Sequence, residues 1–402
     1  QKTAYEIRNC DWSSDVCSSD LITVGDGFSI VIGGAGADSI TAGTGDVWIL
    51  GDNGEIELTD GLVSRVTSTD VDASTAGDDV IVTGDGTNTV IAGLGADSVT
   101  TGTGNDVVLG DAGELLYEAG QLVSAVSTQA GLGGNDAISL GDGDNVAIAG
   151  DGQDSVTAGL GSDIVLGDNG EVTWGPDGVL LSARSTATDQ GDDDVIDLGE
   201  GGSLVIAGLG NDSVTTGLGD DVVLGDNGEA TFTDGVLTSL ISTETSLGGD
   251  DVISVGDGAA TVIAGQGNDT VTTGNSDHVV IGDNGEVTWS ETGELTLVRS
   301  IDIGQGGNDT ITVGDGFSLV IGGAGSDTIT AGTGDVWILG DNGEIELTDG
   351  LVSRVTSTDV DASTAGDDVI VTGDGSNTVI AGLGADGVTT GTGNDVVLGD
   401  AG

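Results

Sequence analysis

The residues of this chain that could do chemistry are aspartates that recur at a fixed offset behind pairs of glycines. Two consecutive nine-residue frames, 92–100 and 101–109, both read xGxGxDxUx, where U is aliphatic. Glycines two residues apart permit positive φ and a tight turn with inward-facing carbonyls, and the aspartate adds a carboxylate to the same concave loop. Calcium takes oxygens from carboxylates and carbonyls in flexible geometry, so this spacing favours a calcium loop over a softer His or Cys site.

Each aspartate is followed by three residues that favour a strand. In the two frames above these residues are SVT and VVL, which are β-formers with an aliphatic side chain in the middle position. A short strand with a single inward side chain therefore follows each loop. One such unit cannot bury its aliphatic residue alone, so stacked copies are needed to join these residues into a narrow continuous core.

The frames resemble the RTX, or hemolysin-type, calcium-binding nonapeptide GGxGxDxUx, as found in large secreted bacterial adhesins. The frame at 33–41, GGAGADSIT, carries both leading glycines of that pattern, and similar frames recur over most of the chain. The resemblance implies an all-β fold, a parallel β-roll or β-solenoid, with a six-residue loop and a three-residue strand per nonapeptide and two nonapeptides per coil. It also implies calcium ions held between the loops of successive coils on the same side.

A longer period of about 58 residues lies over the nonapeptides. The marker GDNGE or GDAGE begins at positions 51, 110, 167, 225, 282 and 340, and GDAG recurs at 399. Each unit holds four loop–strand frames, or about two coils, and segments such as GEIELTDGLVSRVTS that read as strand, turn and strand. We therefore predict a single repeat solenoid over 22–402, with a β-hairpin inserted at every second coil.

The four frames of a unit are not equally suited to calcium. The third frame keeps its aspartate in every unit, whereas the second frame has Asn, Ser or Ala at that position. We therefore expect strong sites in the third frame and weak or absent sites in the second. The predicted calcium ligands, from the first, third and fourth frames, are Asp38, Asp79, Asp97, Asp106, Asp136, Asp154, Asp163, Asp194, Asp212, Asp221, Asp251, Asp269, Asp309, Asp327, Asp368, Asp386 and Asp395.

Residues 1–21 are set apart because they resemble a sequencing adapter translated in one reading frame. QKTAYEI at 1–7 and DWSSDVCSSDL at 11–21 flank a short interruption, and we predict a disordered artefact outside the fold. Both cysteines of the chain, Cys10 and Cys17, lie in this segment, so 22–402 offers neither a disulfide nor a thiol site. The near-identity of 22–113 and 311–402 indicates either a tandem duplication or an assembly error.

The charge balance restricts the partners of the chain. Within 22–402 there are four arginines and 65 acidic residues, a net charge of −61, so nucleic acid and anionic membranes would be repelled. No apolar run approaches the ~18 residues that a membrane helix requires, so we expect no membrane insertion. Self-repulsion and the ordering entropy of the glycines predict disorder without calcium and folding on calcium binding. The lack of methionine and the partial repeats at both ends indicate an internal fragment.

Three functions are consistent with these features. The preferred one is a calcium-binding structural segment of a large extracellular or bacterial cell-surface protein of the adhesin or stalk type, exported by type 1 secretion, because the repeats fill the chain. The second is the RTX secretion module of a type 1 secreted hydrolase whose catalytic domain lies elsewhere. The third is a calcium-dependent ice-binding solenoid, although variation of the loop GTGND to GLGSD and GNSDH predicts that a regular threonine array is absent.

No catalytic residue is assigned. The motifs HExxH and GxSxG do not occur, and the narrow core leaves little room for a concave apolar pocket, so we expect that the chain is not an enzyme. Calcium ions are the expected partners, and lateral protein or surface-glycan contacts through the hairpins stay unspecified.

Four further features have a structural interpretation beside a functional one. His278, the only histidine, replaces a loop aspartate and is interpreted as sequence drift rather than as a ligand. The arginines lie in second hairpin strands and are expected to pair within the chain or to be exposed, rather than to bind acidic ligands. The GDNGE aspartates, such as Asp52 and Asp168, are equally consistent with extra calcium ligands and with turn formers. The repeat tryptophans are expected to pack rather than to form a carbohydrate-stacking surface: Trp48, Trp174, Trp289 and Trp337.

Overall fold

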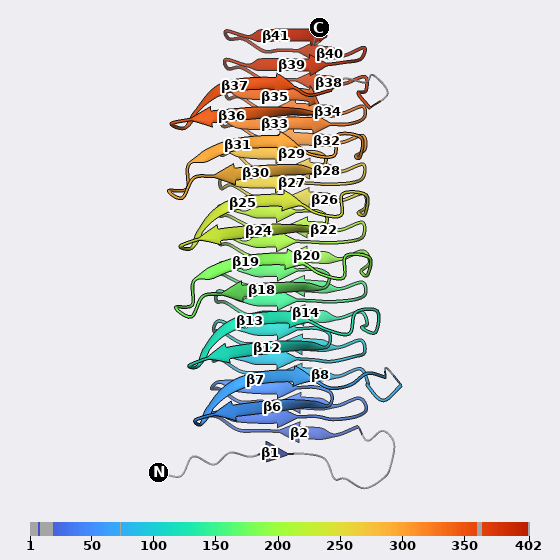
Figure 1. Cartoon of the computed structure of the whole chain (residues 1–402), viewed down its shortest axis with the longest axis vertical. Helices are drawn as coiled ribbons and strands as arrows, with labels where there is room; N and C mark the ends of the chain where they lie inside the picture. The colour runs from blue at the N-terminus through green and yellow to red at the C-terminus, as the bar shows by residue number, and fades with distance from the viewer. Residues whose placement is uncertain (1–6, 9–18, 73, 360–363, 401–402) are drawn as a thin grey trace. The chain divides into compact units, whose positions relative to one another are not determined.

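The chain forms two compact units of stacked β-strands. The computed structural model describes residues 7–8, 19–72, 74–359 and 364–400, and none of these residues is helical. Unit 1 spans Gln1–Glu200 and unit 2 spans Gly201–Gly402. Within each unit the strands stack one above the next and the hairpins project to the same side (Figure 1).

Unit 1 contains two parallel sheets built from the short strands of the repeats. We call them the inner sheet, which a third sheet covers, and the outer sheet, which has one open face. The inner sheet has the order β1 (Ile7–Arg8), β3 (Ser29–Ile32), β5 (Val47–Leu50), β9 (Thr89–Ile91), β11 (Val107–Leu109), β15 (Val146–Ile148) and β17 (Ile164–Leu166). The outer sheet has the order β2 (Leu21–Thr23), β4 (Ser39–Thr41), β8 (Val80–Val82), β10 (Ser98–Thr100), β14 (Ala137–Ser139), β16 (Ser155–Thr157) and β20 (Val195–Asp197).

Two frames make one coil, and consecutive coils pair in register. Ser98 of β10 pairs with Val80 of β8, which lies one 18-residue coil earlier in the chain. On its other side Ser98 pairs with Ala137 of β14, 39 residues later, because a hairpin intervenes. The coil is therefore interrupted at every second turn, as the sequence predicts.

The insertions of unit 1 form a third sheet instead of separate hairpins. This hairpin sheet is antiparallel and has the order β6 (Gly54–Thr59), β7 (Leu62–Ser68), β12 (Gly113–Glu118), β13 (Gln121–Ser127), β18 (Gly170–Trp174) and β19 (Leu180–Ser185). Successive hairpins pair with each other, as Thr67 does with Glu114. The sheet lies over the inner sheet, where Tyr117 of β12 meets Trp48 of β5 with ring centroids 6.4 Å apart.

Unit 2 repeats the same three layers. Its inner sheet has the order β21 (Leu204–Ile206), β23 (Val222–Leu224), β27 (Ala260–Ile263), β29 (His278–Ile281), β33 (Ser318–Gly323), β35 (Val336–Asp341), β39 (Thr378–Gly382) and β41 (Val396–Asp400). Its outer sheet has the order β22 (Ser213–Thr215), β26 (Val252–Ser254), β28 (Thr270–Thr272), β32 (Thr310–Val313), β34 (Thr328–Ala331), β38 (Val369–Val371) and β40 (Gly387–Thr389). Its hairpins are β24 (Gly228–Thr233) with β25 (Val236–Ser242), β30 (Gly285–Trp289) with β31 (Leu295–Ser300), and β36 (Gly343–Thr348) with β37 (Leu351–Ser357).

Burial follows the order of the layers. All three residues of inner strands such as β15 are buried, because this sheet is covered on both faces. Outer strands such as β10 bury only the middle residue, Val99, and expose or half-expose the residues on either side. One aliphatic side chain per strand thus fills the space between the two parallel sheets, and each contributes roughly 1.5–3 kcal/mol through burial.

The predicted fold class, an all-β parallel β-roll with hairpin insertions, is confirmed. Each of the two compact units has this architecture, and the single solenoid over 22–402 stays a prediction. Ordered repeat geometry begins before residue 22, because Leu21 pairs with Ser39 and the Asp20 N–H donates to Asp38 Oδ1 at 2.6 Å. Residues 1–6 and 9–18 of the segment predicted to be disordered lie outside the described residues.

Candidate functional site

The loop aspartates of the first and third frames form one continuous ladder in each unit. Each lies directly before an outer-sheet strand. Before the last member of each series, the backbone N–H of one aspartate donates to Oδ1 of the equivalent aspartate in the next coil, as Asp38 does to Asp79 at 2.7 Å. We call this series the outer ladder. It comprises Asp38, Asp79, Asp97, Asp136, Asp154 and Asp194 in unit 1, and Asp212, Asp251, Asp269, Asp309, Asp327, Asp368 and Asp386 in unit 2.

The second carboxylate oxygen of most outer-ladder aspartates is buried and accepts no hydrogen bond. Such oxygens are costly, because a buried polar atom without a partner loses its hydration and gains nothing in return. The Oδ2 atoms in this state belong to Asp38, Asp79, Asp97, Asp136, Asp154, Asp251, Asp269, Asp309, Asp327 and Asp368. A row of carboxylates buried in this way requires a positive partner.

Glycines leave the space in which these oxygens meet backbone carbonyls. A Cβ placed on Gly51 would lie 2.3 Å from Asp79 Oδ2 and 2.2 Å from the carbonyl oxygen of Ala92. In unit 2, a Cβ on Gly225 would lie equally close to Asp251 Oδ2 and to the Ala264 carbonyl. Only glycine is compatible with such contacts, so these positions keep carboxylate and carbonyl oxygens close together.

Burial changes the titration of the outer ladder. Desolvation raises the pKa of Asp79 to about 9, although a backbone N–H lowers it and neighbouring carboxylates raise it further. The same cause raises the pKa of Asp97 to about 7 and that of Asp309 to about 8. Without a cation these carboxyls therefore keep their protons to higher pH than exposed aspartates do, and a bound divalent cation would favour the ionised form.

A second series precedes the inner-sheet strands, and in it amides take the place of some aspartates. We call it the inner ladder; in unit 1 it includes Asn88, Asp106, Asn145 and Asp163. The Asn88 side-chain nitrogen lies 3.0 Å from the Gly84 carbonyl oxygen, 3.1 Å from that of Gly86 and 2.9 Å from Asp106 Oδ1. An N–H donor therefore occupies a point where three oxygens converge.

The Asn88 amide supplies a hydrogen-bond donor that an aspartate in the same frame position would lack. An aspartate at the same position has no N–H to offer, so the two loop carbonyls of that frame need a donor from elsewhere. Oxygens from carbonyls and one or two carboxylates are the ligands that calcium prefers. The residues therefore fit calcium where the frame carries aspartate, whereas the Asn88 amide already supplies a donor to the converging oxygens.

The structure limits how such an ion could be held. Among the residues that the structure describes, no three His, Cys, Asp or Glu side chains come together as a metal-binding group. A calcium ion would take its carboxylate oxygens from adjacent members of a ladder and most of its other ligands from loop carbonyls. Its chemistry there would be charge neutralisation and cross-linking of coils.

Two of the GDNGE and GDAGE aspartates, which the sequence left open between two interpretations, anchor the loops. Asp111 is buried and accepts backbone N–H bonds through both oxygens, from Asp151 at 2.5 Å and from Gly134 at 3.2 Å. Asp283 accepts in the same way from Ala324 and Gly307. These contacts favour the turn-forming interpretation for Asp111 and Asp283, whose oxygens are already used by the chain. Asp52 accepts from the Leu94 N–H at 2.7 Å through Oδ2, but its Oδ1 is buried without a hydrogen-bond partner, so both interpretations stay open there.

His278 occupies an inner-ladder position in unit 2 and behaves like the amides. It is buried, its Nε2 lies 3.0 Å from the Gly274 carbonyl oxygen, and the Ala260 N–H donates to its Nδ1 at 3.3 Å. Burial lowers the pKa of His278. A neutral imidazole thus satisfies a loop carbonyl, a structural role that the interpretation as sequence drift did not include.

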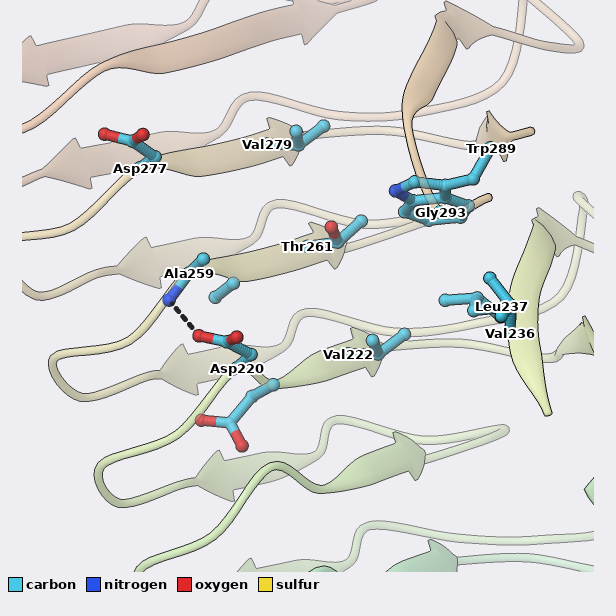
Figure 2. Close-up of a pocket in the computed structure, with 12 residues that line it drawn as sticks. Asp220, Val222, Val236, Leu237, Ala259, Thr261, Asp277, Val279, Trp289 and Gly293 are labelled. Atoms are coloured by element: carbon cyan, nitrogen blue, oxygen red, sulfur yellow. Dashed lines mark hydrogen bonds between the residues drawn. The ribbon is translucent and has the colours of Figure 1, made fainter. Parts of the chain in front are cut away.

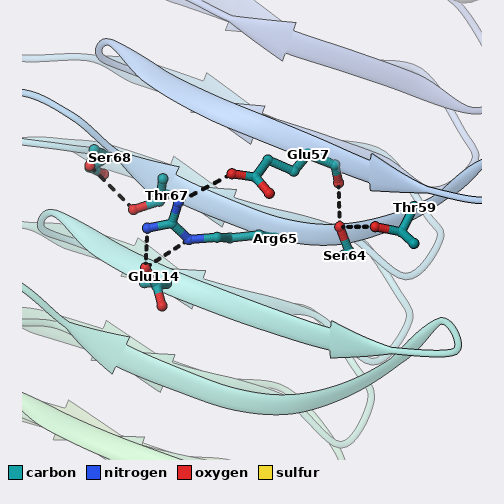
Figure 3. Close-up of polar contacts among 7 residues, drawn as sticks. All are labelled: Glu57, Thr59, Ser64, Arg65, Thr67, Ser68 and Glu114. Atoms are coloured by element: carbon teal, nitrogen blue, oxygen red, sulfur yellow. Dashed lines mark hydrogen bonds and ion pairs between the residues drawn. The ribbon is translucent and has the colours of Figure 1, made fainter.

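The four repeat arginines pair within the hairpin sheet, as expected. Arg65 donates to Glu114 of the next hairpin, with Nη2 2.6 Å from Oε2, and also reaches Glu57 of its own hairpin (Figure 3). Arg184, Arg299 and Arg354 pair with glutamates of their own hairpins. These are half-exposed surface pairs and each contributes little to stability.

The structure divides the seventeen predicted ligands into two sets. Thirteen form the outer ladder, and Asp106, Asp163, Asp221 and Asp395 belong to the inner ladder, where Asn or Ser alternates with them. Two nonapeptides per coil place the first and third frames of a unit on the same side, and the structure shows their aspartates in one ladder at an offset of 18 residues.

A comparison with known families agrees with this arrangement. The RTX calcium-binding nonapeptide repeat (4 copies) matches residues 18–55, 74–108, 130–171, 199–231, 246–277, 254–286, 303–338, 321–344 and 363–397, which is well over half of the chain. The stretches between the matches contain most of the hairpin residues. No curated protein matches the chain. No helix suited to crossing a membrane occurs in the part of the chain that the structure describes. The chain therefore belongs to the RTX calcium-binding nonapeptide repeat family, and it is a calcium-binding structural repeat protein.

Proposed function

We propose that the chain is a calcium-stiffened, non-enzymatic stalk segment of a large extracellular or bacterial cell-surface protein of the adhesin type, exported unfolded by type 1 secretion. The observation that carries this proposal is the hairpin sheet. Calcium binding requires only the loops, whereas the hairpins of successive repeats pair with each other by backbone hydrogen bonds, as β7 does with β12 and β25 with β30. Such pairing adds a second connection along each unit.

The charge of the chain supports folding outside the cell. Ladder carboxylates repel one another when calcium is absent, so a low-calcium cytosol would keep the chain unfolded and suitable for export. Extracellular calcium would neutralise the ladders and couple binding to folding.

The stalk proposal is tested by mechanical and solution measurements on the same decalcified chain. Calcium addition is expected to produce the β-sheet signal in circular dichroism and an extended particle in small-angle X-ray scattering, and equal magnesium is expected to fail. Single-molecule pulling of the calcium-loaded chain is expected to require high force, with length increments near multiples of one 58-residue repeat. A chain that stays ordered in chelator, or that unfolds at negligible force with calcium bound, would contradict a stalk.

The competing secretion-module function makes a different prediction. A chain whose main role is export would carry a fused passenger enzyme out of a type 1 secretion host, and shortening it to a few repeats would retain that ability. A stalk would instead lose reach in proportion to the repeats removed, with no change in passenger activity.

A calcium-dependent ice-binding surface is a second candidate, because threonines form rows across neighbouring strands on the open face of the outer sheet in unit 2. Thr270, Thr310 and Thr328 are paired across neighbouring strands in one row, which we call a rank. All three lie on the exposed face. Thr272, Thr312 and Thr330 form the adjacent rank. The predicted absence of a regular threonine array concerned the loops, whereas these threonines lie on strands β28, β32 and β34. Thermal hysteresis in calcium that is lost in Thr310→Lys would support this function.

A further inference from the structure

Unit 2 contains a pocket of about 490 Å³ between its inner sheet and its hairpin sheet. Its floor is one rank of the inner sheet, formed by Val222, Thr261 and Val279, which are paired in register. Val236 and Leu237 of β25 and Trp289 of β30 line the hairpin side (Figure 2). The floor and roof are largely apolar, as in most sites for small molecules.

The pocket is open because the floor residues are small. In unit 1, the rank that contains Thr89 and Val107 also contains Trp48, whose indole packs between Phe28, at 4.7 Å between ring centroids, and Tyr117. Tyr117 and Trp289 are both the fifth residue of their first hairpin strand. Trp289 therefore covers Val222, Thr261 and Val279, where Tyr117 covers an indole.

The two ends of the pocket differ in chemistry. Trp289 and Gly293 lie at one end, and the exposed carboxylates of Asp220 and Asp277 lie at the other (Figure 2). The Ala259 N–H donates to Asp220 Oδ1 at 2.8 Å and the Phe317 N–H donates to Asp277 Oδ1 at 2.9 Å, which orients both carboxylates. Each has a further oxygen that can accept a hydrogen bond from a ligand.

We propose that this pocket binds a neutral oligosaccharide, with one sugar ring stacked on Trp289 and hydroxyl groups of a neighbouring ring donating to Asp220 and Asp277. An indole offers a large apolar face for the C–H face of a sugar, and hydrogen bonds from hydroxyls to a carboxylate are charge-assisted. The carboxylates exclude anionic ligands, and the pocket volume exceeds that of a single hexose. The inference does not depend on the stalk function.

The chain supplies an internal comparison at Trp174, which holds the same hairpin position in unit 1. There Asn105 and Ser162 stand at the positions of Asp220 and Asp277, and Gln121 stands at that of Val236. Ile164 replaces Val279 on the floor. Trp174 is therefore a matched control, because its removal disturbs an equivalent hairpin without touching the pocket.

The test uses the full calcium-loaded chain and four probes: maltotriose, cellotriose, tri-galacturonate as an anionic sugar, and hexylamine as an apolar cation. We expect at least one neutral trisaccharide to bind with millimolar or better affinity by saturation-transfer NMR and tryptophan fluorescence. Trp289→Ala should weaken that binding at least tenfold, Trp174→Ala should leave it unchanged, and the double variant Asp220→Asn with Asp277→Asn should weaken it three- to tenfold.

A second variant protects the test against hairpin disruption. Val222→Trp leaves Trp289 in place and fills the pocket from the floor, in the manner of Trp48, so it should abolish binding while circular dichroism stays unchanged. Binding of hexylamine or tri-galacturonate alone, no binding of either neutral sugar, or equal losses in Trp289→Ala and Trp174→Ala would each overturn the proposal.

Discussion

The backbone N–H of Asp79 donates to Oδ1 of Asp97, 2.6 Å away and one coil further along the chain. Through this bond, Oδ1 of Asp97 holds two coils in register. Oδ2 of Asp97 is buried without a hydrogen-bond partner. Register needs only an acceptor, whereas cation binding needs a negative charge. The two roles can therefore be separated by substituting asparagine for aspartate.

Exchanging acid and amide between the ladders should move calcium from one to the other. Asp97→Asn keeps the acceptor for Asp79 but removes the charge, so we expect about one fewer calcium ion per chain and a higher calcium midpoint for folding. Asn88→Asp removes the amide donor to Gly84 and Gly86 and should add about one ion. Isothermal titration calorimetry measures both counts. Asp85→Asn, at an exposed loop position, is the control and should change neither; equal effects of all three variants would show that the ladders are not the sites.

Low pH should stabilise the metal-free chain, because protonation removes the carboxylate charge that calcium would otherwise neutralise. Burial raises the pKa of Asp97 from 3.8 to about 7 and that of Asp327 to about 8, so the folded form binds protons more tightly than the unfolded form. Metal-free stability is then highest near pH 4 and falls as the pH rises towards about 9. A pKa shift of one unit corresponds to about 1.4 kcal/mol, so ionisation of Asp97 alone lowers the free energy of unfolding by roughly 4 kcal/mol.

Circular dichroism of decalcified chain measures this effect. At pH 5, above the sequence pI of about 4.1, we expect more β-structure than at pH 7.5, and calcium should restore the β-signal at pH 7.5. A metal-free chain with the same signal at both pH values would show that the carboxyls are not desolvated as the structure indicates.

Gly95→Ala should be strongly destabilising. Gly95 has φ of +140°, and a Cβ there would lie 2.4 Å from the Gly77 carbonyl oxygen of the adjacent coil. Both the backbone conformation and the contact oppose a side chain, so we expect a loss of at least about 3 kcal/mol in urea unfolding with calcium present. Gly25→Ala, where no atom lies within 4 Å, is the control and should stay within about 0.5 kcal/mol of the parent chain. Similar losses at both positions would contradict close stacking of the loops.

His278→Asn should be tolerated and His278→Ala should not. Asparagine can donate to the Gly274 carbonyl as Asn88 does to Gly84 and Gly86, whereas alanine leaves that buried carbonyl without the imidazole. We expect His278→Ala to lose about 1–3 kcal/mol in calcium-saturated urea unfolding, and His278→Asn less than half of that loss. Equal stability of the two variants would mean that the imidazole only fills space.

The repeat frame is sufficient to predict most of the fold. Six-residue loops, three-residue strands and an 18-residue coil follow from residue types at fixed offsets, as the pairing of Val99 with Ile81 and Ile138 shows. The hairpins were also predictable, because TDG and ETGE separate β-forming runs. Their pairing with one another was not, since Arg65 and Glu114 carry no sign of each other in a local pattern.

The candidate site was predicted in part. The seventeen aspartates were identifiable because Asp follows two glycines, but their grouping into two ladders depends on which frames stack on one another. The interpretation of the tryptophans as packing residues holds for Trp48, which contacts Phe28 and Tyr117. Trp289 instead lines a pocket, because small residues from three different coils meet beneath it.

Local chemistry is therefore what the sequence alone determined: a Gly/Asp loop that suits calcium, a short strand, and a strongly acidic chain. Tertiary structure alone decided which oxygens are buried without partners, which amides donate to converging oxygens, and where side chains leave a cavity. These properties depend on contacts between residues 18 or about 40 positions apart, whose distances arise only when coils stack.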